Sequence, residues 1–365
     1  WEGLHASFEF RPFSMRERLL TQAVILVEYL RQVFAPSLSA LGIIHDDFPV
    51  SRSLLNPATT LLSVLLIIAA VAGALWQRRR WPIVSFGILW FFAGHSLEAG
   101  PLPIELYFEH RNYLPLIGPV IAVCSLLTLV PRRFGRYAYI GVALFLCFEA
   151  IVTWQSAKLW GDEDLMMRVT LVHRPVSLRM QQYAGNQYIL AGQFEQALEA
   201  QASIAAKFPE HTSTRLSILN LQCLLGTITP EHISAARRFL GTGAFDPQIV
   251  TFFPVLLARA GDAVCPIFDL QEFRSLIGAV LGNPRIAGNS KTRGAAHYFN
   301  GLSFYTEGRL DEAVSQLDMS FDTWPEIDVR LRQVVWLLSA GRTEDAQRYL
   351  DLTRQFREER FWRRN

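Results

Sequence analysis

The hydrophobic residues of this chain gather in long runs that lie almost entirely before Ser156. A helix needs about 20 mostly apolar residues to cross a bilayer, because lipid offers the backbone no hydrogen-bonding partner. Four runs fit this requirement, and only the last contains an acidic residue, Glu149. The runs cover residues 57–76, 81–97, 113–131 and 137–156. The pattern therefore predicts four transmembrane helices within residues 58–157.

Arginines in the turns between these runs indicate their orientation. Three follow one another at 78–80, between the first and second runs, and three more lie within 132–136, between the third and fourth. Loops rich in Lys and Arg face the cytoplasm. The remaining connection, residues 98–112, holds three glutamates and one arginine. We therefore expect a multi-pass inner (plasma) membrane protein in which residues 1–57 and everything after Ser156 are extracytoplasmic, or periplasmic in a Gram-negative cell.

Residues 19–34 form a shorter apolar segment that Glu28 and Arg31 interrupt. Its apolar residues recur at helical spacing beside a polar side, which predicts an amphipathic helix lying on or dipping into the outer leaflet. The alternative is a fifth span packed against the other helices. The chain begins at Trp1, with neither the basic start nor the apolar core of a signal peptide. We therefore expect an N-terminal portion to precede it.

The second half contains an internal repeat of small and aromatic residues at fixed spacing. The first copy is Gly185, Tyr188, Gly192, Ala197 and Pro209, and the second is Gly301, Phe304, Gly308, Ala313 and Pro325. The first glycine lets two helices approach closely, the second ends a helix in a left-handed cap, and the proline stops the following helix. This is the tetratricopeptide (TPR) pattern, so residues 165–365 are predicted to form a TPR-like α-solenoid that grips an extended polypeptide. The alternative is a scaffold without a binding role.

Composition and charge add few restrictions. Of the 365 residues, 19% are charged and the net charge is +2, which gives no basis for a nucleic-acid site. Strand-like alternation of polar and apolar residues is absent, so the predicted fold class is all-α. The His and Cys residues lack zinc-site spacing, and neither a metal nor another cofactor is predicted. Cys223 and Cys265 would pair only in an oxidising compartment, and we do not expect a disulfide because nothing in the sequence sets their separation.

Polar residues at the mouth of the third run are the first candidates for chemistry: Glu109, His110, Arg111 and Tyr113. A guanidinium matches a phosphate bidentately, so Arg111 suits the phosphate of a lipid-linked sugar. Glu109 would orient Arg111 or His110. The alternative is an ion pair within the loop that holds two spans together.

A second polar cluster lies in the N-terminal outer segment. His45, Asp46 and Arg52 are weaker candidates for a contact with a sugar donor or an acceptor. His95 and Glu149 stand inside apolar runs, where such groups are more often internal partners, although ionisable residues within membranes are functional candidates by default.

The run from Glu109 to Gly118 reads Glu-His-Arg-Asn-Tyr-Leu-Pro-Leu-Ile-Gly and follows Pro-Leu-Pro-Ile-Glu-Leu at 101–106. Together with the order of spans and then repeats, it resembles the extracytoplasmic motif of the TPR-containing GT-C membrane glycosyltransferases. These include the transmembrane and tetratricopeptide repeat-containing protein O-mannosyltransferases and their bacterial relatives. The resemblance implies transfer of a sugar from a polyprenyl-phosphate donor to a protein acceptor on the outer face. It makes the four polar residues at 109–113 contacts of the donor phosphate or lipid.

In that family an acidic catalytic residue lies in the first outer loop. The resemblance implies that this chain corresponds to the C-terminal portion of such an enzyme, so no catalytic residue is assigned and the chain alone is expected to be inactive. The sequence thus predicts polytopic transmembrane helices followed by a TPR-like α-solenoid, in a protein glycosyltransferase whose repeats recruit a protein acceptor. The alternative is a non-enzymatic membrane-anchored TPR adaptor for envelope, pilus or polysaccharide assembly.

Overall fold

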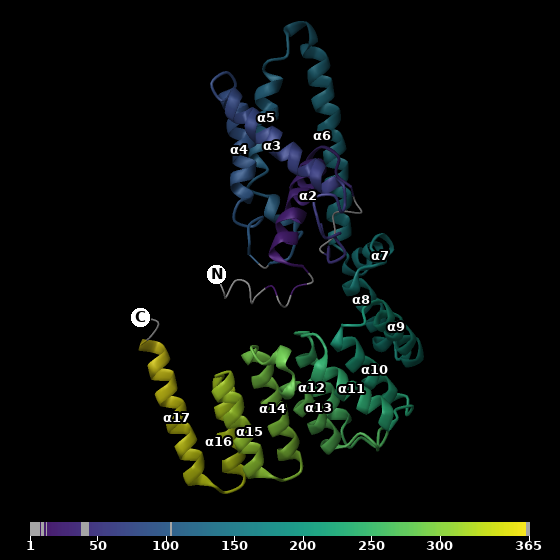
Figure 1. Cartoon of the computed structure of the whole chain (residues 1–365), viewed down its shortest axis with the longest axis vertical. Coiled ribbons are helices and arrows are strands. Elements are labelled where there is room, and N and C mark those ends of the chain that lie inside the picture. The colour runs from purple at the N-terminus through teal and green to yellow at the C-terminus, as the bar shows by residue number, and fades with distance from the viewer. Residues whose placement is uncertain (1–7, 9–10, 12, 38–43, 103, 363–365) are drawn as a thin grey trace. The chain divides into compact units, whose positions relative to one another are not determined.

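The computed structural model describes residues 8, 11, 13–37, 44–102 and 104–362, with side chains as far as Arg357. Within these residues the regular structure is helical, no strand is present, and one isolated bridge joins Ser53 and Asn56. The predicted all-α fold class is confirmed. The chain divides into two compact units, residues 1–183 and 184–365, each of which is described by itself (Figure 1).

The first unit contains the apolar helices of the sequence. Its elements are α2 (Met15–Phe34), α3 (Thr59–Gln77), α4 (Pro82–His95), the 3-10 helix η1 (Glu109–Asn112), α5 (Ile117–Leu127), α6 (Arg132–Trp160), α7 (Glu163–His173) and α8 (Leu178–Leu190), which continues past residue 183. Each of the four predicted apolar runs contributes one of the helices α3 to α6.

These four helices differ in length. α3 has 19 residues and α6 has 29, and both are long and apolar enough to cross a membrane. α4 has 14 residues and α5 has 11. Residues 113–116, the start of the third predicted run, form a turn, and Pro115 favours this because the residue before a proline avoids the helical conformation. A four-span module therefore remains a prediction.

α6 is apolar on both sides, and none of its residues is buried. Leu144 and Leu146 face opposite sides of the helix and are 66% and 60% exposed. A helix that is apolar all round is found in a protein core or in a membrane. By its length and composition α6 could cross a membrane.

The predicted amphipathic helix is present as α2, but its apolar side packs on protein. It begins at Met15, four residues earlier than predicted, because Ser14 and Glu17 form a capping box. Its buried apolar residues belong to a cluster made of Ile25, Leu26, Tyr29, Phe91 and Tyr107. The sequence pattern alone predicted a lipid surface for this side, whereas α4 and the loop after it cover it.

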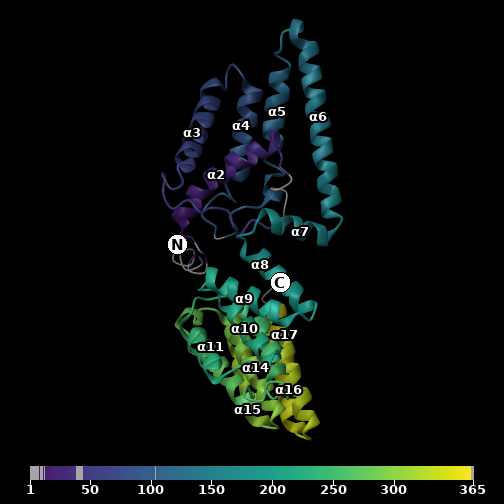
Figure 2. The same ribbon diagram turned by 90° about the vertical axis from the view of Figure 1, so that its right-hand side faces the viewer.

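The second unit is a series of antiparallel helix pairs (Figure 2). Its further elements are α9 (Phe194–Lys207), α10 (Thr212–Leu224), α11 (Pro230–Thr242), α12 (Ile249–Arg259), α13 (Leu270–Gly282), η2 (Pro284–Ile286), α14 (Ser290–Thr306), α15 (Leu310–Thr323), α16 (Ile327–Ser339) and α17 (Thr343–Trp362). The first helices of successive pairs, α10, α12 and α14, contact one another in turn, and α11 contacts α13. This packing is that of stacked helical hairpins.

Glycines of the repeat lie at helix ends and at a helix crossing. Gly192, Gly308 and Gly341 follow α8, α14 and α16 with φ of +72°, +77° and +75°, the left-handed conformation that favours glycine. Gly301 lies where α14 crosses α15, and a Cβ added there would lie 2.3 Å from Cδ1 of Leu317. Larger residues at position 301 would therefore push the two helices apart.

The other repeat positions occupy the same two hairpins. Ala197 and Ala313 are fully buried, and Tyr188 is 39% exposed. Pro209 and Pro325 each lie two residues beyond the end of a helix, α9 and α15 respectively. The two remaining positions make close contacts within a hairpin: Gly185 faces Gln201, and Phe304 packs beneath the guanidinium of Arg309.

A disulfide joins Cys223 of α10 to Cys265, which lies between α12 and α13, with Cα atoms 5.1 Å apart. Both residues are buried in one core cluster of the second unit. This pair was not expected from the sequence. The packing of α10 on α12 brings the two cysteines together across a sequence separation of 42 residues.

Replacing both of these cysteines by alanine is expected to lower the free energy of unfolding of the second unit by about 4 kcal/mol, because the bond restricts the unfolded chain across a separation of 42 residues. Urea unfolding of the full chain in detergent, followed by circular dichroism, measures the change. The matched control replaces the free Cys124 and Cys147 by alanine and should leave the unfolding of the second unit unaltered. Equal stability of the two double variants would contradict the prediction.

Candidate functional site

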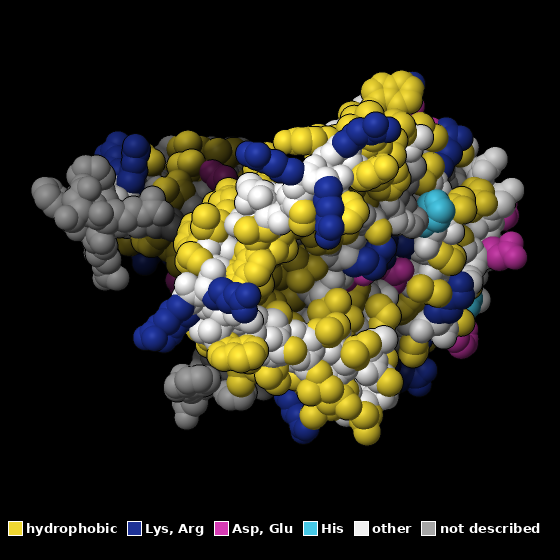
Figure 3. Space-filling model, turned by 90° about the horizontal axis from the view of Figure 1, so that it is seen from above, with side chains coloured by type: hydrophobic (Ala, Val, Ile, Leu, Met, Phe, Trp, Pro, Cys, Tyr) yellow, Lys and Arg dark blue, Asp and Glu magenta, His cyan; other side chains and the backbone are white. Residues whose placement is uncertain are grey.

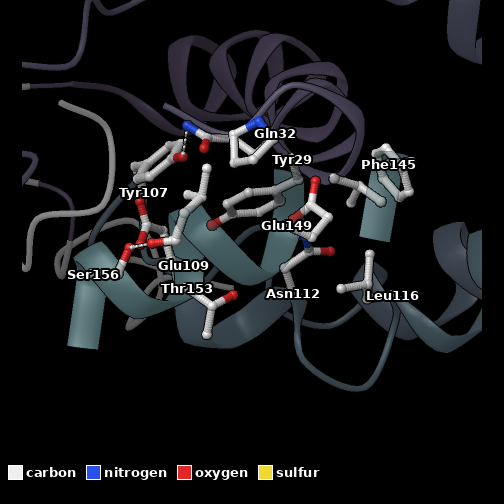
Figure 4. Close-up of a pocket in the computed structure, with 13 residues that line it drawn as sticks. Tyr29, Gln32, Tyr107, Glu109, Asn112, Leu116, Phe145, Glu149, Thr153 and Ser156 are labelled. Carbon is white, nitrogen blue, oxygen red and sulfur yellow. Dashed lines mark hydrogen bonds between the residues drawn. The ribbon is translucent and has the colours of Figure 1, made fainter. Parts of the chain in front are cut away.

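A pocket of about 470 Å³ opens in the first unit between α2, the loop around η1 and α6 (Figure 4). Its polar lining comes from all three: Tyr29 and Gln32 of α2, Tyr107, Glu109 and Asn112 of the loop, and Glu149, Thr153 and Ser156 of α6. The α6 residues recur at positions 149, 153 and 156, the spacing of one helix face. No group of three or more His, Cys, Asp or Glu side chains among the described residues is placed to hold a metal ion.

Arg18 of α2 holds the loop that forms one wall of the pocket. Its guanidinium is fully buried and donates hydrogen bonds to three backbone carbonyls, those of Glu98, Gly100 and Ile104, at 2.7, 3.0 and 2.6 Å. Burial lowers the pKa of Arg18 to about 10, which leaves it charged at neutral pH. The loop is therefore tied to α2 by charge-assisted hydrogen bonds.

Three acceptor oxygens in the pocket accept no hydrogen bond from the residues that the structure describes. They are Oε1 of Gln32, Oε1 of Glu109 and Oε1 of Glu149, and each atom is buried. Among the described residues that line the pocket there is no Lys, Arg or His. Because buried polar atoms are normally hydrogen-bonded, this arrangement suits a ligand that donates hydrogen bonds, such as a hydroxyl-bearing molecule, and does not suit an anion.

Glu109 has the electrostatic properties of a proton-transfer group. Burial raises the pKa of Glu109 from 4.5 to about 7, the charge of Arg174 opposes the rise, and that of Glu28 adds to it. At neutral pH the carboxyl is therefore populated in both protonation states. Groups that accept and return protons in catalysis have such values.

A chain of polar contacts lies behind Glu109. Nε2 of His45 lies 3.5 Å from Oε1 of Glu109, and Nδ1 of His45 lies 2.6 Å from Nη2 of Arg174. Nη1 of Arg174 donates to Asp47 at 2.6 Å. Since a guanidinium can only donate, Nδ1 of His45 accepts, and in the neutral ring Nε2 carries the hydrogen that faces Glu109. At 3.5 Å this contact is too long for a good hydrogen bond, so Oε1 of Glu109 remains open to a donor from a ligand.

Two buried tyrosines complete this wall. Oη of Tyr29 donates to the carbonyl of Phe108 at 2.7 Å, and the ring of Tyr107 lies 4.3 Å from that of His45. Burial raises the pKa of Tyr29 to about 12 and raises the pKa of Tyr107 as well. Both hydroxyls therefore stay protonated at neutral pH.

Of the residues predicted from the sequence, the structure brings His45 and Glu109 together. Asp46 instead accepts hydrogen bonds from the hydroxyl of Ser177, just before α8, and from the backbone nitrogen of Arg179 in the first turn of α8. Arg52 pairs with Glu17 near the start of α2, with Nη1 and Oε1 2.8 Å apart. Neither Asp46 nor Arg52 lines the pocket.

Arg111 makes contacts within its own loop. Its Nη1 donates to the carbonyl of Glu105 at 2.6 Å, and its Nε lies 3.7 Å from the carboxylate of Glu98. His110 packs on a neighbouring aromatic ring, and Tyr113 is 87% exposed. These contacts match the alternative of an ion pair within the loop. A role of these residues toward a donor phosphate stays a prediction.

Several pocket residues were not proposed from the sequence as ligand contacts. Glu149 drew notice as an acid within an apolar run, but nothing connected it with Glu109. Gln32 lies on the polar side of α2 and Tyr29 on its buried apolar side, and the spacing of both indicates a helix and no ligand. Arg174, which faces His45, carries no sequence signal at all.

A buried cluster of Ser, His and Asp in the second unit has the residue types of a catalytic triad, but its contacts stabilise the fold. Nδ1 of His211 lies 3.1 Å from Oγ of Ser213, and its Nε2 lies 3.4 Å from the carboxylate of Asp246. Ser213 is 1% exposed, and Asp246 also accepts a hydrogen bond from the backbone nitrogen of Ser213 at 2.8 Å. The cluster thus joins the start of α10 to the turn before α12 and gives a substrate no access to the serine.

No protein-family model matches the chain, and no curated protein matches its sequence. Solved structures with a partial likeness include "Crystal structure of MamA protein", at 16% identity and a TM-score of 0.30, covering 50% of this chain and 92% of that chain. Another is "MamA 41-end from Desulfovibrio magneticus RS-1", at 13% identity and a TM-score of 0.28, covering 50% of this chain and 96% of that chain. At these TM-scores the likeness defines neither fold nor function.

Proposed function

We propose that the chain belongs to a membrane glycosyltransferase that uses a polyprenyl-phosphate-linked sugar, and that its helical repeats bind the protein acceptor. The pocket holds the sugar, and Glu109 accepts a hydrogen bond or a proton from one of the reacting hydroxyls. The resemblance of residues 109–118 to the GT-C motif supplies the reaction class. The chemistry of the pocket supports the same class independently.

The observation that carries this proposal is the set of buried oxygens on Gln32, Glu109 and Glu149 that accept no hydrogen bond within the described part of the chain. Sugar hydroxyls are donors that would satisfy all three. Leu116 and Phe145 lie on the other side of the pocket, away from Tyr107 and Glu109 (Figure 4). A sugar ring, with hydroxyls at its edge and C–H groups on its face, matches both sides.

The phosphate of the donor has no cationic partner among the residues that line the pocket. The two acids of the pocket, Glu109 and Glu149, would repel a phosphate placed between them when they are ionised. We therefore assign the pocket to the neutral sugar and place the phosphate outside it. Contact of the phosphate with Arg111 rests on the family resemblance alone.

The pocket lies at the depth where an outer-leaflet lipid presents its head. From Arg136, at the arginine-rich end of α6, to Ser156 in the pocket, the helix rises about 30 Å, which is the thickness of the hydrocarbon core. Figure 3 looks on to the arginine-rich end, where dark blue side chains stand among yellow hydrophobic ones. If this end faces the cytoplasm, the polar side of the pocket reaches the outer boundary of the membrane.

The disulfide gives a second argument for this orientation. Cys223 and Cys265 are bonded within the repeats, and disulfides persist mainly in oxidising compartments. Placing the repeats on the extracytoplasmic side therefore agrees with the arginines of the turns, although the two arguments use different residues. The membrane concerned would be the inner (plasma) membrane.

Filling the pocket tests the proposal. Thr153→Trp places an indole among the polar residues and is expected to lower sugar transfer at least about tenfold, because the sugar loses its position next to Glu109. The measurement is transfer of radiolabelled sugar from a polyprenyl-phosphate donor to acceptor protein, in membranes that carry the complete protein.

The matched control is Ile151→Trp on the opposite side of α6, where the side chain is 56% exposed and does not line the pocket. This variant should transfer sugar at the normal rate. Normal transfer by Thr153→Trp, in membranes containing equal amounts of protein, would exclude the pocket as the sugar site.

A membrane-anchored adaptor without enzymatic activity is the second candidate. It is favoured by a row of exposed apolar residues on α16, Leu331, Val335 and Leu338, which are 42%, 60% and 52% exposed. Their spacing places them on one helix face. An adaptor would bind its partner equally well with and without Thr153→Trp, and membranes carrying the complete protein would transfer no sugar.

A further inference from the structure

A second cavity, of about 430 Å³, lies in the second unit between α10 and α11. One wall is apolar, with Leu219 of α10 and Ala236 and Phe239 of α11. Two arginines and a histidine also line the cavity: Arg215, Arg238 and His232. The cavity thus combines an apolar surface with positive charge.

The cavity is open because α10 and α11 approach each other less closely than α14 and α15 do. In the latter pair Gly301 permits a close crossing, whereas the guanidinium of Arg215 occupies the space between the helices and lies 4.6 Å from the ring centre of Phe239. α11 packs on α13, but it has no comparable contact with α9. The side of α11 toward the preceding helix pair therefore has no comparable cover among the described residues.

The charge of the cavity is not neutralised within its walls. Its lining, as far as the structure describes it, includes no Asp or Glu. Nε of Arg215 is buried and has no hydrogen-bond partner among the described residues, and Nη2 makes only a long contact, 3.5 Å, with the carbonyl of Pro209. A buried guanidinium nitrogen without an acceptor calls for an anion, and a carboxylate fits its geometry.

We infer that this cavity binds an acidic side chain of a protein partner, together with the apolar residue next to it in the partner's sequence. The carboxylate pairs with Arg215 and Arg238, and the apolar side chain contacts Leu219 and Phe239. A volume of about 430 Å³ is within the range of sites that hold small ligands and is too small for a folded domain. The inference deepens the proposed binding of a protein acceptor by the repeats and rests on that part of the proposed function.

The test measures peptide binding to the full chain in detergent by fluorescence anisotropy. The probe is a short labelled peptide of alternating leucine and glutamate, and its matched control has glutamine in place of glutamate. The acidic peptide should bind at least about tenfold more tightly than the control peptide. Arg238→Gln should weaken binding of the acidic peptide by about tenfold, since a charge-assisted hydrogen bond is lost. Arg238 is exposed, so this change leaves the fold intact. Arg215→Gln should have a larger effect.

Arg237→Gln is the control variant, because Arg237 does not line the cavity and instead donates to Ser275 at 3.3 Å. It should bind the acidic peptide normally. Equal binding of the two peptides, or equal loss in Arg237→Gln and Arg238→Gln, would overturn the inference. Inorganic phosphate that competes as strongly as the peptide would show a simple anion site and also overturn it. The assay involves no sugar transfer, so its failure is distinct from failure of the glycosyltransferase proposal.

Discussion

Glu109→Gln should lower sugar transfer by about a hundredfold or more, in membranes that carry the complete protein. The glutamine keeps the size of the side chain and can still accept a hydrogen bond, but it cannot take up a proton. General acid–base groups contribute about 10²- to 10⁴-fold to enzymatic rates. The loss should appear in kcat, because a hydrogen-bond acceptor remains for binding the sugar.

The pH dependence of transfer gives the same prediction a second readout. The pKa of Glu109 is raised to about 7 by burial, so activity should rise as pH increases through about 7 and the carboxyl loses its proton. This rise should disappear in Glu109→Gln. His110→Gln, a substitution at the adjacent residue outside the pocket, should retain it.

Stability separates a catalytic from a structural role for Glu109. A carboxyl whose pKa is higher in the folded than in the unfolded state destabilises the fold when ionised. This destabilisation begins above pH 4.5 and is complete above about 7. Glu109→Gln should therefore be at least as stable as the parent at pH 8. A variant that loses transfer only because it unfolds at that pH would contradict the catalytic assignment.

Arg18→Met should lower the free energy of unfolding of the first unit by about 5 kcal/mol. The change leaves the carbonyls of Glu98, Gly100 and Ile104 without their donors, and each buried unpaired group costs about 1–3 kcal/mol. Thermal unfolding in detergent should show a Tm lower by about 15 °C, because 1 kcal/mol shifts the Tm of a domain of this size by about 2–4 °C.

Arg16→Met is the matched control for this loss. Arg16 lies two residues earlier on the same helix and is exposed, so its replacement should shift the Tm by no more than about 2 °C. Arg18→Lys should recover only part of the loss, because a single ammonium cannot reproduce the planar fork that reaches three carbonyls. A protein with Arg18→Met that melts with the parent would show that the loop is held by other contacts.

The sequence predicts the helices well because their signals are local. Gly192 and Gly308 mark helix ends because each takes up the left-handed conformation there. The apolar runs can be recognised from the composition of each segment alone. The lengths of α4 and α5 were harder to predict, since an apolar run does not show where a turn interrupts it. Pro115 was the available signal for the late start of α5, and proline is tolerated in the first turn as well as before it.

The pocket was beyond sequence reasoning for a different reason. Gln32, Glu109 and Glu149 come from three distant segments, and the contacts that assemble one of its walls are side-chain bonds to backbone carbonyls. Every residue has a carbonyl, so the sequence does not indicate that Arg18 binds the loop before η1. The motif at 109–113 marked the right loop, but only Glu109 of its four polar residues lines the cavity.

The α6 residues of the pocket extend from Phe145 to Ser156, which is about 16 Å along a helix. If Ser156 lies at the membrane boundary, Phe145 lies in the middle of the acyl chains. The donor then reaches its site by lateral diffusion within the bilayer. The enzyme would then respond to the mole fraction of donor among the surrounding lipids. Diluting the vesicles in buffer would leave turnover unaffected, whereas diluting the donor with inert phospholipid would slow it.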